Sequence, residues 1–213
     1  MTEQERMKAG YIWLDDEGNM AMQARARELV TRFNALPAEA NQERMEMNGE
    51  MFGSCGKNVW IVPPIKFTIG KHITIGEGCY FNQGTTFIDD WKIEIGHHCL
   101  FGPNVTICTT GHPVSPKHRM DGMYSFPIRI GNNCWIGANV VILPGVTIGD
   151  NSVIGAGSIV TKDIPANVVA FGSPCHVFRE INEQDDEYYF RGHRFDEQPA
   201  REGEKPVLDF MEN

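Results

Sequence analysis

The chain contains no hydrophobic run that approaches the roughly 20 apolar residues of a membrane-spanning helix. Its charged first residues also lack the apolar core of a signal peptide, so we expect a cytoplasmic protein with no membrane partner. Basic residues are few, because 19 Lys and Arg stand against 28 Asp and Glu, which gives a formal net charge of −9. Binding a phosphate backbone needs clustered Lys and Arg, so this charge argues against a nucleic-acid partner.

What the chain does have is a repeat of six residues. Hexapeptides that open with an aliphatic residue run without a break from Ile130 to Ile164. Neither an amphipathic helix nor an alternating strand has a period of six, so the pattern indicates a solenoid of short strands and tight bends. A looser array precedes it, and its units open at Ile69, Ile75, Phe81, Ile95 and Phe101.

Within each unit, the opening residue is expected to point into the coil, and a small residue four positions later shares that interior. These small positions run from Ile73 to Ser158 and include Cys79, Cys99 and Cys134. A cysteine there packs as a small hydrophobe, so we expect free thiols rather than disulfides. Three units close one triangular turn, and each turn is stabilised by its neighbours.

Composition divides the chain into three regions. Residues 1–56 are rich in helix formers and are predicted to form a cap over the open end of the coil. The sequence Asn-Ala-Leu-Pro at 34–37 predicts a break between two helices of this cap. Residues 57–182 are the repeat domain, with an extended loop at 108–127, and residues 183–213 form an acidic and aromatic tail.

The loop contains the best catalytic candidate, His112, in the sequence Thr-Thr-Gly-His-Pro. A neutral imidazole with a pKa near 6.5 is suited to remove a proton from a hydroxyl group at neutral pH. The alternative is that His112 satisfies backbone groups where the loop leaves the coil. Cys108 is a competing nucleophile, but nothing marks it as exposed or as having a lowered pKa.

Several segments resemble the hexapeptide-repeat acyltransferases, and more closely their galactoside and maltose O-acetyltransferase group. They are MKAGYIWLDD, YFNQGTTFIDD, VTICTTGHPV, MYSFPIRIGNNCWIGANVVILPGV and SPCHVFREIN. The general rule for parallel crossovers would give a right-handed coil. The resemblance implies instead an all-β solenoid, a left-handed parallel β-helix with a small N-terminal helical cap and an irregular C-terminal tail.

The resemblance further implies an acetyl-CoA-dependent sugar O-acetyltransferase in which His112 is the general base and the hydroxyl attacks the thioester directly. It implies a cytoplasmic homotrimer with active sites between subunits, and it places an oxyanion donor at a backbone N–H near Asn82. The implied acceptor-binding residues are Asp15, Thr68, Tyr80, Asn82, Asp90 and Met123. The implied coenzyme A-binding residues are Trp135, Ala138, Ala156, Thr161, Lys162, His176 and Arg179. Thr68 and His176 depart from the family pattern of serine and arginine.

Simpler structural roles stay open for some of these residues. Asp90 suits a turn, Asp15 a helix cap, Asn82 a coil corner and Trp135 an interface. Other functions stay open too: acetylation of another small hydroxyl compound such as chloramphenicol or serine, or a silent structural solenoid. A carbonic anhydrase-like metal site would draw on His72, His97, His98, His112 and His118, but His97 and His98 occupy outward positions, and we expect no metal.

Overall fold

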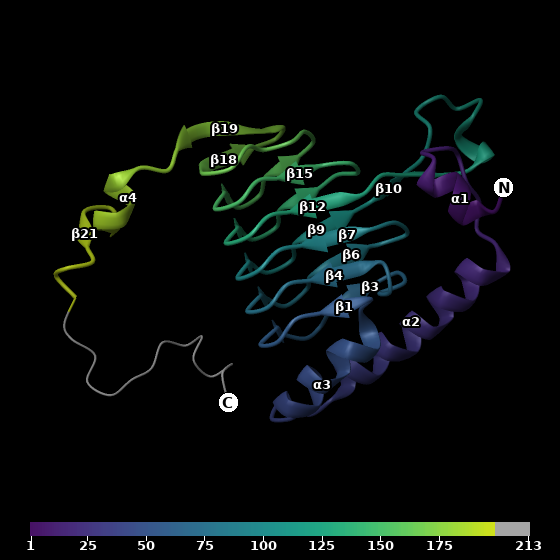
Figure 1. Ribbon diagram of the computed structural model, residues 1–213, viewed down its shortest axis with the longest axis horizontal. Helices are drawn as coiled ribbons and strands as arrows, with labels where there is room; N and C mark the ends of the chain where they lie inside the picture. The colour runs from purple at the N-terminus through teal and green to yellow at the C-terminus, as the bar shows by residue number, and fades with distance from the viewer. Residues whose placement is uncertain (199–213) are drawn as a thin grey trace.

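Stacked coils form a prism whose three faces are β-sheets (Figure 1), and the computed structural model describes residues 1–198 of the chain. The first face consists of β1 (Ser54–Cys55), β4 (Ile73–Ile75), β7 (Ile93–Ile95), β12 (Ile128–Ile130) and β15 (Thr147–Ile148). The second consists of β2 (Trp60–Ile61), β5 (Tyr80–Phe81), β8 (Leu100–Phe101), β13 (Trp135–Ile136), β16 (Val153–Ile154), β18 (Val168–Gly172) and β19 (Cys175–Glu180). The third consists of β3 (Lys66–Phe67), β6 (Thr86–Ile88), β9 (Thr106–Cys108), β14 (Val141–Ile142) and β17 (Ile159–Val160).

Three corners join these faces. The chain crosses from the second face to the third at the second corner, which comprises residues 82–85, 102–105, 137–140 and 155–158. It returns from the third face to the first at the third corner, which comprises residues 68–72, 89–92, 109–127, 143–146 and 161–163. Successive coils pair in parallel register, and among the strands of these three faces only β19 runs antiparallel, against β18. These ladders confirm the predicted parallel β-helix.

The interior of the coil follows the predicted pattern of large and small residues. Every predicted small inward position is buried: Ile73, Cys79, Thr85, Cys99, Val105, Cys134, Val140, Val146, Ser152 and Ser158. Large residues stack along the axis, as in the pair Phe81 and Phe101, whose ring centroids lie 4.5 Å apart. All six cysteines are free thiols. The core is therefore a set of columns in which each side chain contacts its counterpart in the next coil.

Asparagine supports the sharp bends between strands. Asn133, Asn151 and Asn167 adopt positive φ, a conformation that Asn tolerates better than most residues. Their side chains form a ladder, in which the Nδ2 of Asn133 donates to the Oδ1 of Asn151 at 3.1 Å and the Nδ2 of Asn151 donates to the Oδ1 of Asn167 at 2.8 Å.

Helices cover the end of the coil at β1. The helical segments of the described residues are α1 (Glu3–Lys8), α2 (Glu17–Ala35), α3 (Asn41–Met51), α4 (Glu183–Glu187) and the short 3-10 turn η1 (Arg119–Asp121). The break between α2 and α3 confirms the predicted interruption before Pro37. Phe33, Met51 and Phe52 are buried in the same cluster as the lowest coils, so the cap closes the core. None of these helices combines the length and the apolar character needed to cross a bilayer.

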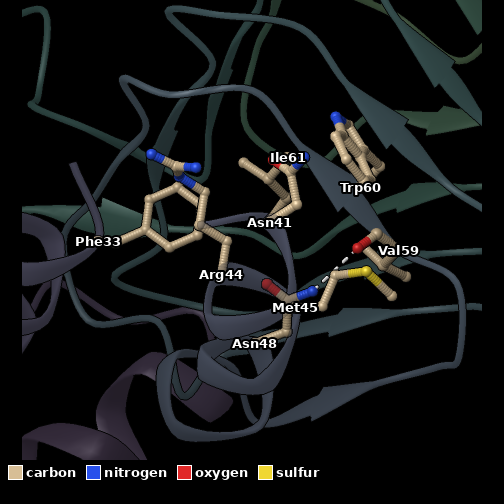
Figure 2. A pocket seen from close by; sticks show the side chains of 8 residues that line it. All are labelled: Phe33, Asn41, Arg44, Met45, Asn48, Val59, Trp60 and Ile61. Atoms are coloured by element: carbon tan, nitrogen blue, oxygen red, sulfur yellow. Dashed lines mark hydrogen bonds between the residues drawn. The ribbon is translucent and has the colours of Figure 1, made fainter. Parts of the chain in front are cut away.

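The junction between cap and coil contains a buried Arg44 (Figure 2). Its guanidinium donates to the carbonyl oxygens of Leu36 and Pro37 at 2.6 and 2.7 Å. These two backbone acceptors lie just beyond the end of α2 and thereby gain a hydrogen-bond donor. The adjoining cavity measures about 10 Å³ and is lined by residues of α2, α3 and β2. A space of this size holds at most about one water molecule, so it is not a ligand site.

Two hairpins lie outside the coil. The hairpin of β10 (Thr110–Gly111) and β11 (Tyr124–Ser125) forms the neck of the long loop at the third corner. The hairpin of β20 (Tyr188–Phe190) and β21 (His193–Arg194) follows α4 and lies away from the prism (Figure 1). Residues 199–213 of the predicted tail lie outside the described residues.

Candidate functional site

The third corner is where the six-residue repeat is interrupted. The strand residues Phe67, Phe87 and Ile107 lie in register on the third face, and all three are buried. Residues 68–73, 88–93 and 108–128 separate them from the paired first-face residues Thr74, Glu94 and Arg129, whereas residues 143–146 suffice between Ile142 and Thr147 in the next coil. The prediction that a unit opens at Ile69 is therefore wrong, because Ile69 lies within a lengthened corner. Three successive coils thus place their extra residues along one edge of the prism.

Asp89 organises this edge from inside. Its carboxylate is buried and accepts hydrogen bonds from the backbone N–H groups of Thr68, Ile69 and Gly70 at 2.9, 3.0 and 2.6 Å. Burial raises the pKa of Asp89 to about 7, although these N–H groups oppose the shift by favouring the charged form. The side chain of Asp89 therefore holds one corner of the coil together and does not face a substrate.

Asp90 is the next residue and is also buried, with 7% of its surface exposed. Burial raises the pKa of its carboxyl group, while a hydrogen bond from the Thr110 hydroxyl lowers it and the negative charge of Asp15 raises it further. Asp15 and Asp90 are thus neighbours in space although they are far apart in the sequence. A simple turn role does not account for a buried carboxylate with these partners.

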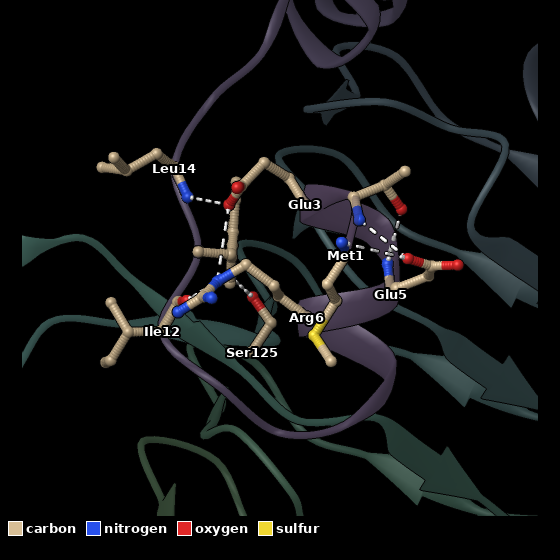
Figure 3. Close-up of polar contacts among 9 residues, drawn as sticks. Met1, Glu3, Glu5, Arg6, Ile12, Leu14 and Ser125 are labelled. Atoms are coloured by element: carbon tan, nitrogen blue, oxygen red, sulfur yellow. Dashed lines mark hydrogen bonds and ion pairs between the residues drawn. The ribbon is translucent and has the colours of Figure 1, made fainter.

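The N-terminal segment that precedes Asp15 and contains Ile12 and Leu14 lies beside Ser125 of the loop neck (Figure 3). The backbone of Trp13 pairs with that of Met123, and both N–H···O distances are 2.9 Å. The segment is tied to α1 because Glu3 accepts a hydrogen bond from the N–H of Leu14 at 2.7 Å and the Nε of Arg6 donates to the carbonyl of Ile12. Asp15 itself is exposed and accepts a hydrogen bond from the Nε2 of Gln23 at 3.1 Å.

The cap of α2 is Asp16 and not Asp15. The side chain of Asp16 accepts a hydrogen bond from the N–H of Asn19 at 2.8 Å at the start of the helix. Asp15 is therefore left without the structural role that the sequence kept open for it.

His112 lies on the loop of the third corner, directly after β10. Its imidazole is exposed and makes no side-chain hydrogen bond to the described residues. The ring therefore does not satisfy the backbone at the loop exit, which was the alternative to a catalytic role. Burial raises the pKa of the nearby Cys108 thiol, so its thiolate is disfavoured as a nucleophile.

Other predicted residues lie across the third face from this edge. Tyr80 and Trp135 are on the outer side of the second face, and Trp135 is 56% exposed. Asn82 is at the second corner without positive φ, so the backbone conformation there does not require asparagine. Its Oδ1 accepts a hydrogen bond from the N–H of Gln83 at 2.8 Å, which leaves its Nδ2 as a free donor within the described part.

The predicted cofactor residues fall at three places. Ala138 and Ala156 occupy equivalent positions of adjacent coils at the second corner, where the N–H of Gly157 donates to the carbonyl of Ala138 at 2.8 Å. Thr161 and Lys162 are exposed at the third corner of the last coil.

His176 and Arg179 lie on β19, and both are exposed. The guanidinium of Arg179 forms two hydrogen bonds of 2.6 Å with Asp185, an interaction that holds the pKa of Asp185 at about 2. Arg179 therefore already has an anionic partner in this structure. The Nδ1 of His176 lies 3.2 Å from the carbonyl oxygen of Pro174.

One chain therefore presents two separate sets of predicted residues. The third-corner set is Asp15, Thr68, Asp90, His112 and Met123, and the second-face set is Tyr80, Asn82, Trp135, Ala138 and Ala156. The strands of the third face lie between them. Within residues 1–198, no group of three or more His, Cys, Asp or Glu side chains is arranged to hold a metal ion.

Comparison with known proteins places this geometry in a family. Residues 127–162 match the family model "Bacterial transferase hexapeptide (six repeats)", and residues 6–56 match "Maltose acetyltransferase hexapeptide capping motif". The galactoside O-acetyltransferase of Escherichia coli K12 is 51% identical over 192 residues, which are 89% of this chain and 95% of the relative. The chain belongs to the galactoside and maltose O-acetyltransferase family.

Solved structures of this acetyltransferase family share the fold. A galactoside acetyltransferase in complex with coenzyme A superposes with a TM-score of 0.88 and 50% identity, over 91% of this chain and 98% of the other. A maltose O-acetyltransferase from Clostridium difficile 630 gives a TM-score of 0.83 and 42% identity, over 86% of this chain and 99% of the other. The protein is an acyltransferase of a family whose members bind coenzyme A.

The resemblance implied that a backbone N–H near Asn82 binds the oxyanion, but the backbone N–H groups of Asn82 and Gln83 already have partners in this acetyltransferase. The N–H of Asn82 donates to the carbonyl of Phe101 at 3.0 Å in the ladder, and the N–H of Gln83 donates to the Asn82 side chain. Neither group is free to bind an oxyanion. The Nδ2 of Asn82 is the free donor at this position.

Sequence reasoning also missed the residues that hold the edge of the acetyltransferase together. Trp13, Thr109 and Ser125 are buried polar or amphipathic side chains from distant segments. Trp13 was visible in the sequence as a large aromatic residue two positions before Asp15, but nothing there showed its partner.

Proposed function

We propose that this acetyltransferase transfers the acetyl group of acetyl-CoA to a hydroxyl group of a sugar, a galactoside or a maltose- or glucose-like acceptor. The observation that carries the proposal is the exposed imidazole of His112, which has no hydrogen-bond partner among residues 1–198, on the same edge as the carboxylates of Asp15 and Asp90. Carboxylates recognise several hydroxyl groups by accepting hydrogen bonds, and such a site discriminates strongly against molecules that lack them. The names of the relatives, galactoside and maltose acetyltransferases, support the sugar class.

In the proposed reaction, His112 removes the proton from the acceptor hydroxyl as its oxygen attacks the thioester carbonyl. The resulting tetrahedral intermediate carries an oxyanion that needs a hydrogen-bond donor. Collapse of this intermediate breaks the carbon–sulfur bond, and the protonated His112 returns its proton to the leaving sulfur. The products are the acetylated sugar and coenzyme A with a free thiol, and no acetyl-enzyme forms.

We further propose that the site is completed between two subunits of a homotrimer. The third-corner set and the second-face set lie on different parts of one prism, so one chain does not enclose an acceptor and a thioester with both sets. Cyclic symmetry places the same edge of each subunit against a different face of the next. The exposed apolar residues Leu100 and Trp135 on the second face supply surface for such a contact.

In this arrangement, coenzyme A lies along the second corner, where Ala138 and Ala156 allow the backbone to approach it. Thr161, Lys162, His176 and Arg179 are the residues proposed to meet its nucleotide end. Arg179 would have to exchange Asp185 for a phosphate, or bind the phosphate beside it.

The test is a thiol-release assay with acetyl-CoA over a panel of galactosides, maltose, glucose, serine and chloramphenicol. We expect a sugar to be the best acceptor, and we expect His112→Ala to lower kcat by about 10²- to 10⁴-fold, the usual contribution of a general base. Cys108→Ala is the matched control and should keep most activity, because the thiol of Cys108 is half-buried and its pKa is raised. A large loss in Cys108→Ala with an active His112→Ala would overturn the mechanism. Preference for chloramphenicol or serine would overturn the sugar class.

A further inference from the structure

We propose that a line of buried side-chain hydrogen bonds from Trp13 through Ser125 to Thr110 positions the acceptor carboxylates relative to the loop that carries His112. Trp13, Ser125 and Thr110 are thus positioning residues. This proposal rests on the proposed function, because it takes sugar acetylation as the reaction. The hydrogen-bonded arrangement itself can be tested without measuring enzyme activity.

The first link joins the N-terminal segment to the loop. The indole Nε1 of Trp13 donates to the Oγ of Ser125 at 3.0 Å, and both side chains are only 1% exposed. Figure 3 shows Ser125 beside Ile12, within the bend of the N-terminal segment. An indole N–H is only a donor, so it requires an acceptor once it is buried.

The second link crosses the neck of the loop. The Oγ of Ser125 lies 2.7 Å from the Oγ1 of Thr110, which is its partner across the β10–β11 hairpin. The Thr110 hydroxyl also favours the charged carboxylate of Asp90, because it lowers the pKa of that group. Thr110 has a single hydroxyl proton, so if it donates to Asp90, Ser125 must donate to Thr110. Each donor then points the same way, from the indole to the carboxylate.

A side branch fixes the neighbouring turn. The hydroxyl of Thr109, the residue before Thr110, donates to the carbonyl of Ile88 at 2.9 Å and accepts a hydrogen bond from the N–H of Trp91 at 3.1 Å. Ile88 and Trp91 flank Asp89 and Asp90. The branch therefore locks the turn that carries Asp90 to the base of the loop.

The ends of this network coincide with the proposed site. Trp13 is two residues before Asp15 and pairs through its backbone with Met123, while Thr110 is two residues before His112. Removal of one member leaves a buried donor or acceptor without a partner, which is costly. Because three separate segments meet here, the result is a shift of Asp15 and the loop relative to Asp90 rather than a loss of the coil.

The experiment compares Ser125→Ala and Thr110→Val with Thr110→Ser, which keeps the hydroxyl group. Ser152→Ala is the matched control, because Ser152 is equally buried and donates to the carbonyl of Pro165 at 2.8 Å, outside this network. Two properties are measured for each variant: amide hydrogen exchange of residues 11–15 and 109–127, and kcat and KM for the sugar and for acetyl-CoA.

We expect exchange in both segments to accelerate about tenfold or more in Ser125→Ala and Thr110→Val, since one buried hydrogen bond is lost. The kcat/KM for the sugar should fall by a similar factor, while the KM for acetyl-CoA stays within about twofold. Thr110→Ser and Ser152→Ala should behave as wild type in both measurements. If Ser125→Ala does not fold, the Thr110 pair decides the question, because Thr110 is only half-buried.

Unchanged exchange in Thr110→Val, or equal damage in Thr110→Ser and Thr110→Val, would overturn the positioning role. An equal loss for the sugar and for acetyl-CoA would also overturn it, because it would indicate a general loss of structure. A wild-type protein that acetylates no sugar would instead contradict the proposed function, and the exchange data would still decide whether the network holds the loop.

Discussion

Two adjacent carboxylates at the start of α2 have different surroundings. Asp16 caps the helix through the N–H of Asn19, whereas Asp15 faces the edge that carries Asp90. We expect Asp16→Ala to lower the free energy of unfolding by about 1 kcal/mol, as for other lost N-caps, with unchanged sugar kinetics.

Asp15→Ala should show the opposite pattern. The kcat/KM for the sugar should fall by about 10- to 100-fold, because a hydrogen bond to a charged group is lost, while stability changes little. Urea unfolding and acetyl-transfer kinetics on both variants check the pair. If Asp16→Ala lowered the kcat/KM for the sugar and Asp15→Ala lowered stability, the roles given to the two residues would be wrong.

The buried carboxyl group of Asp89 gives the protein a specific dependence on pH. Its pKa is about 7 in the folded chain, against 3.8 for an ordinary Asp. Between these values the folded state binds more protons than the unfolded state, so the contribution of Asp89 to stability is full below about pH 4 and is lost as pH rises through about 7.

We therefore expect Asp89→Asn to reduce the fall in stability between pH 5 and pH 8, measured as the change in urea midpoint over that range. The absolute stability also falls in this variant, because Asn replaces one acceptor oxygen with a donor, so only the pH slope is diagnostic. Asp150→Asn, at an exposed site, should leave the slope unchanged. An identical slope in Asp89→Asn and wild type would contradict the raised pKa.

At the scale of the element, the coil corners depend on close approach between successive turns. A Cβ atom at Gly137 would lie 2.6 Å from the backbone nitrogen of Ala156, and backbone in the next coil cannot move aside easily. We expect Gly137→Ala to lower the free energy of unfolding by about 1–3 kcal/mol, as other overpacked sites do.

Gly49 in α3 provides the control of opposite sign. No atom lies within 4 Å of a Cβ added there, so Gly49→Ala should stabilise the protein by about 0.5–1 kcal/mol through helix propensity. Thermal or urea unfolding of both variants tests the pair. A neutral Gly137→Ala would mean that adjacent coils can separate at the second corner.

At the scale of the whole molecule, the proposed sharing of each site between subunits predicts complementation. We expect His112→Ala and Asn82→Ala each to be inactive alone, because they remove residues from the third-corner set and the second-face set. If the two variants are unfolded and refolded together, random mixing in a trimer should leave about a quarter of the sites with both residues intact. Activity near a quarter of wild type supports the shared site, and no recovery in a mixed trimer would place both residues in one subunit.

The sequence predicted the coil well because its repeat is a local property. The small inward positions could be identified from spacing alone, and Cys79, Cys99 and Cys134 are buried as expected. The prediction failed where the repeat stops, so Ile69 was taken as the start of a unit although it lies in a long corner. Where a corner is longer than the six-residue repeat allows, residue spacing no longer predicts which side chains point inward.

His112 and its loop could also be found from the sequence, because a motif and an interruption coincide there. The partners of the loop could not. Trp13 and Ser125 meet only after the N-terminal segment has folded back over the coil, and Asp16 rather than Asp15 became the helix cap through the exact start of α2.

The stacked coil follows from local sequence alone, since a period of six with aliphatic and small residues satisfies the interior of every turn without reference to distant segments. Which residues gather at the third corner and which lie on the second face depends on how distant segments pack. The reason is physical: ladder pairing fixes neighbours along the axis, whereas the contacts of residues 1–16 with the loop depend on buried hydrogen bonds between groups that no local pattern relates.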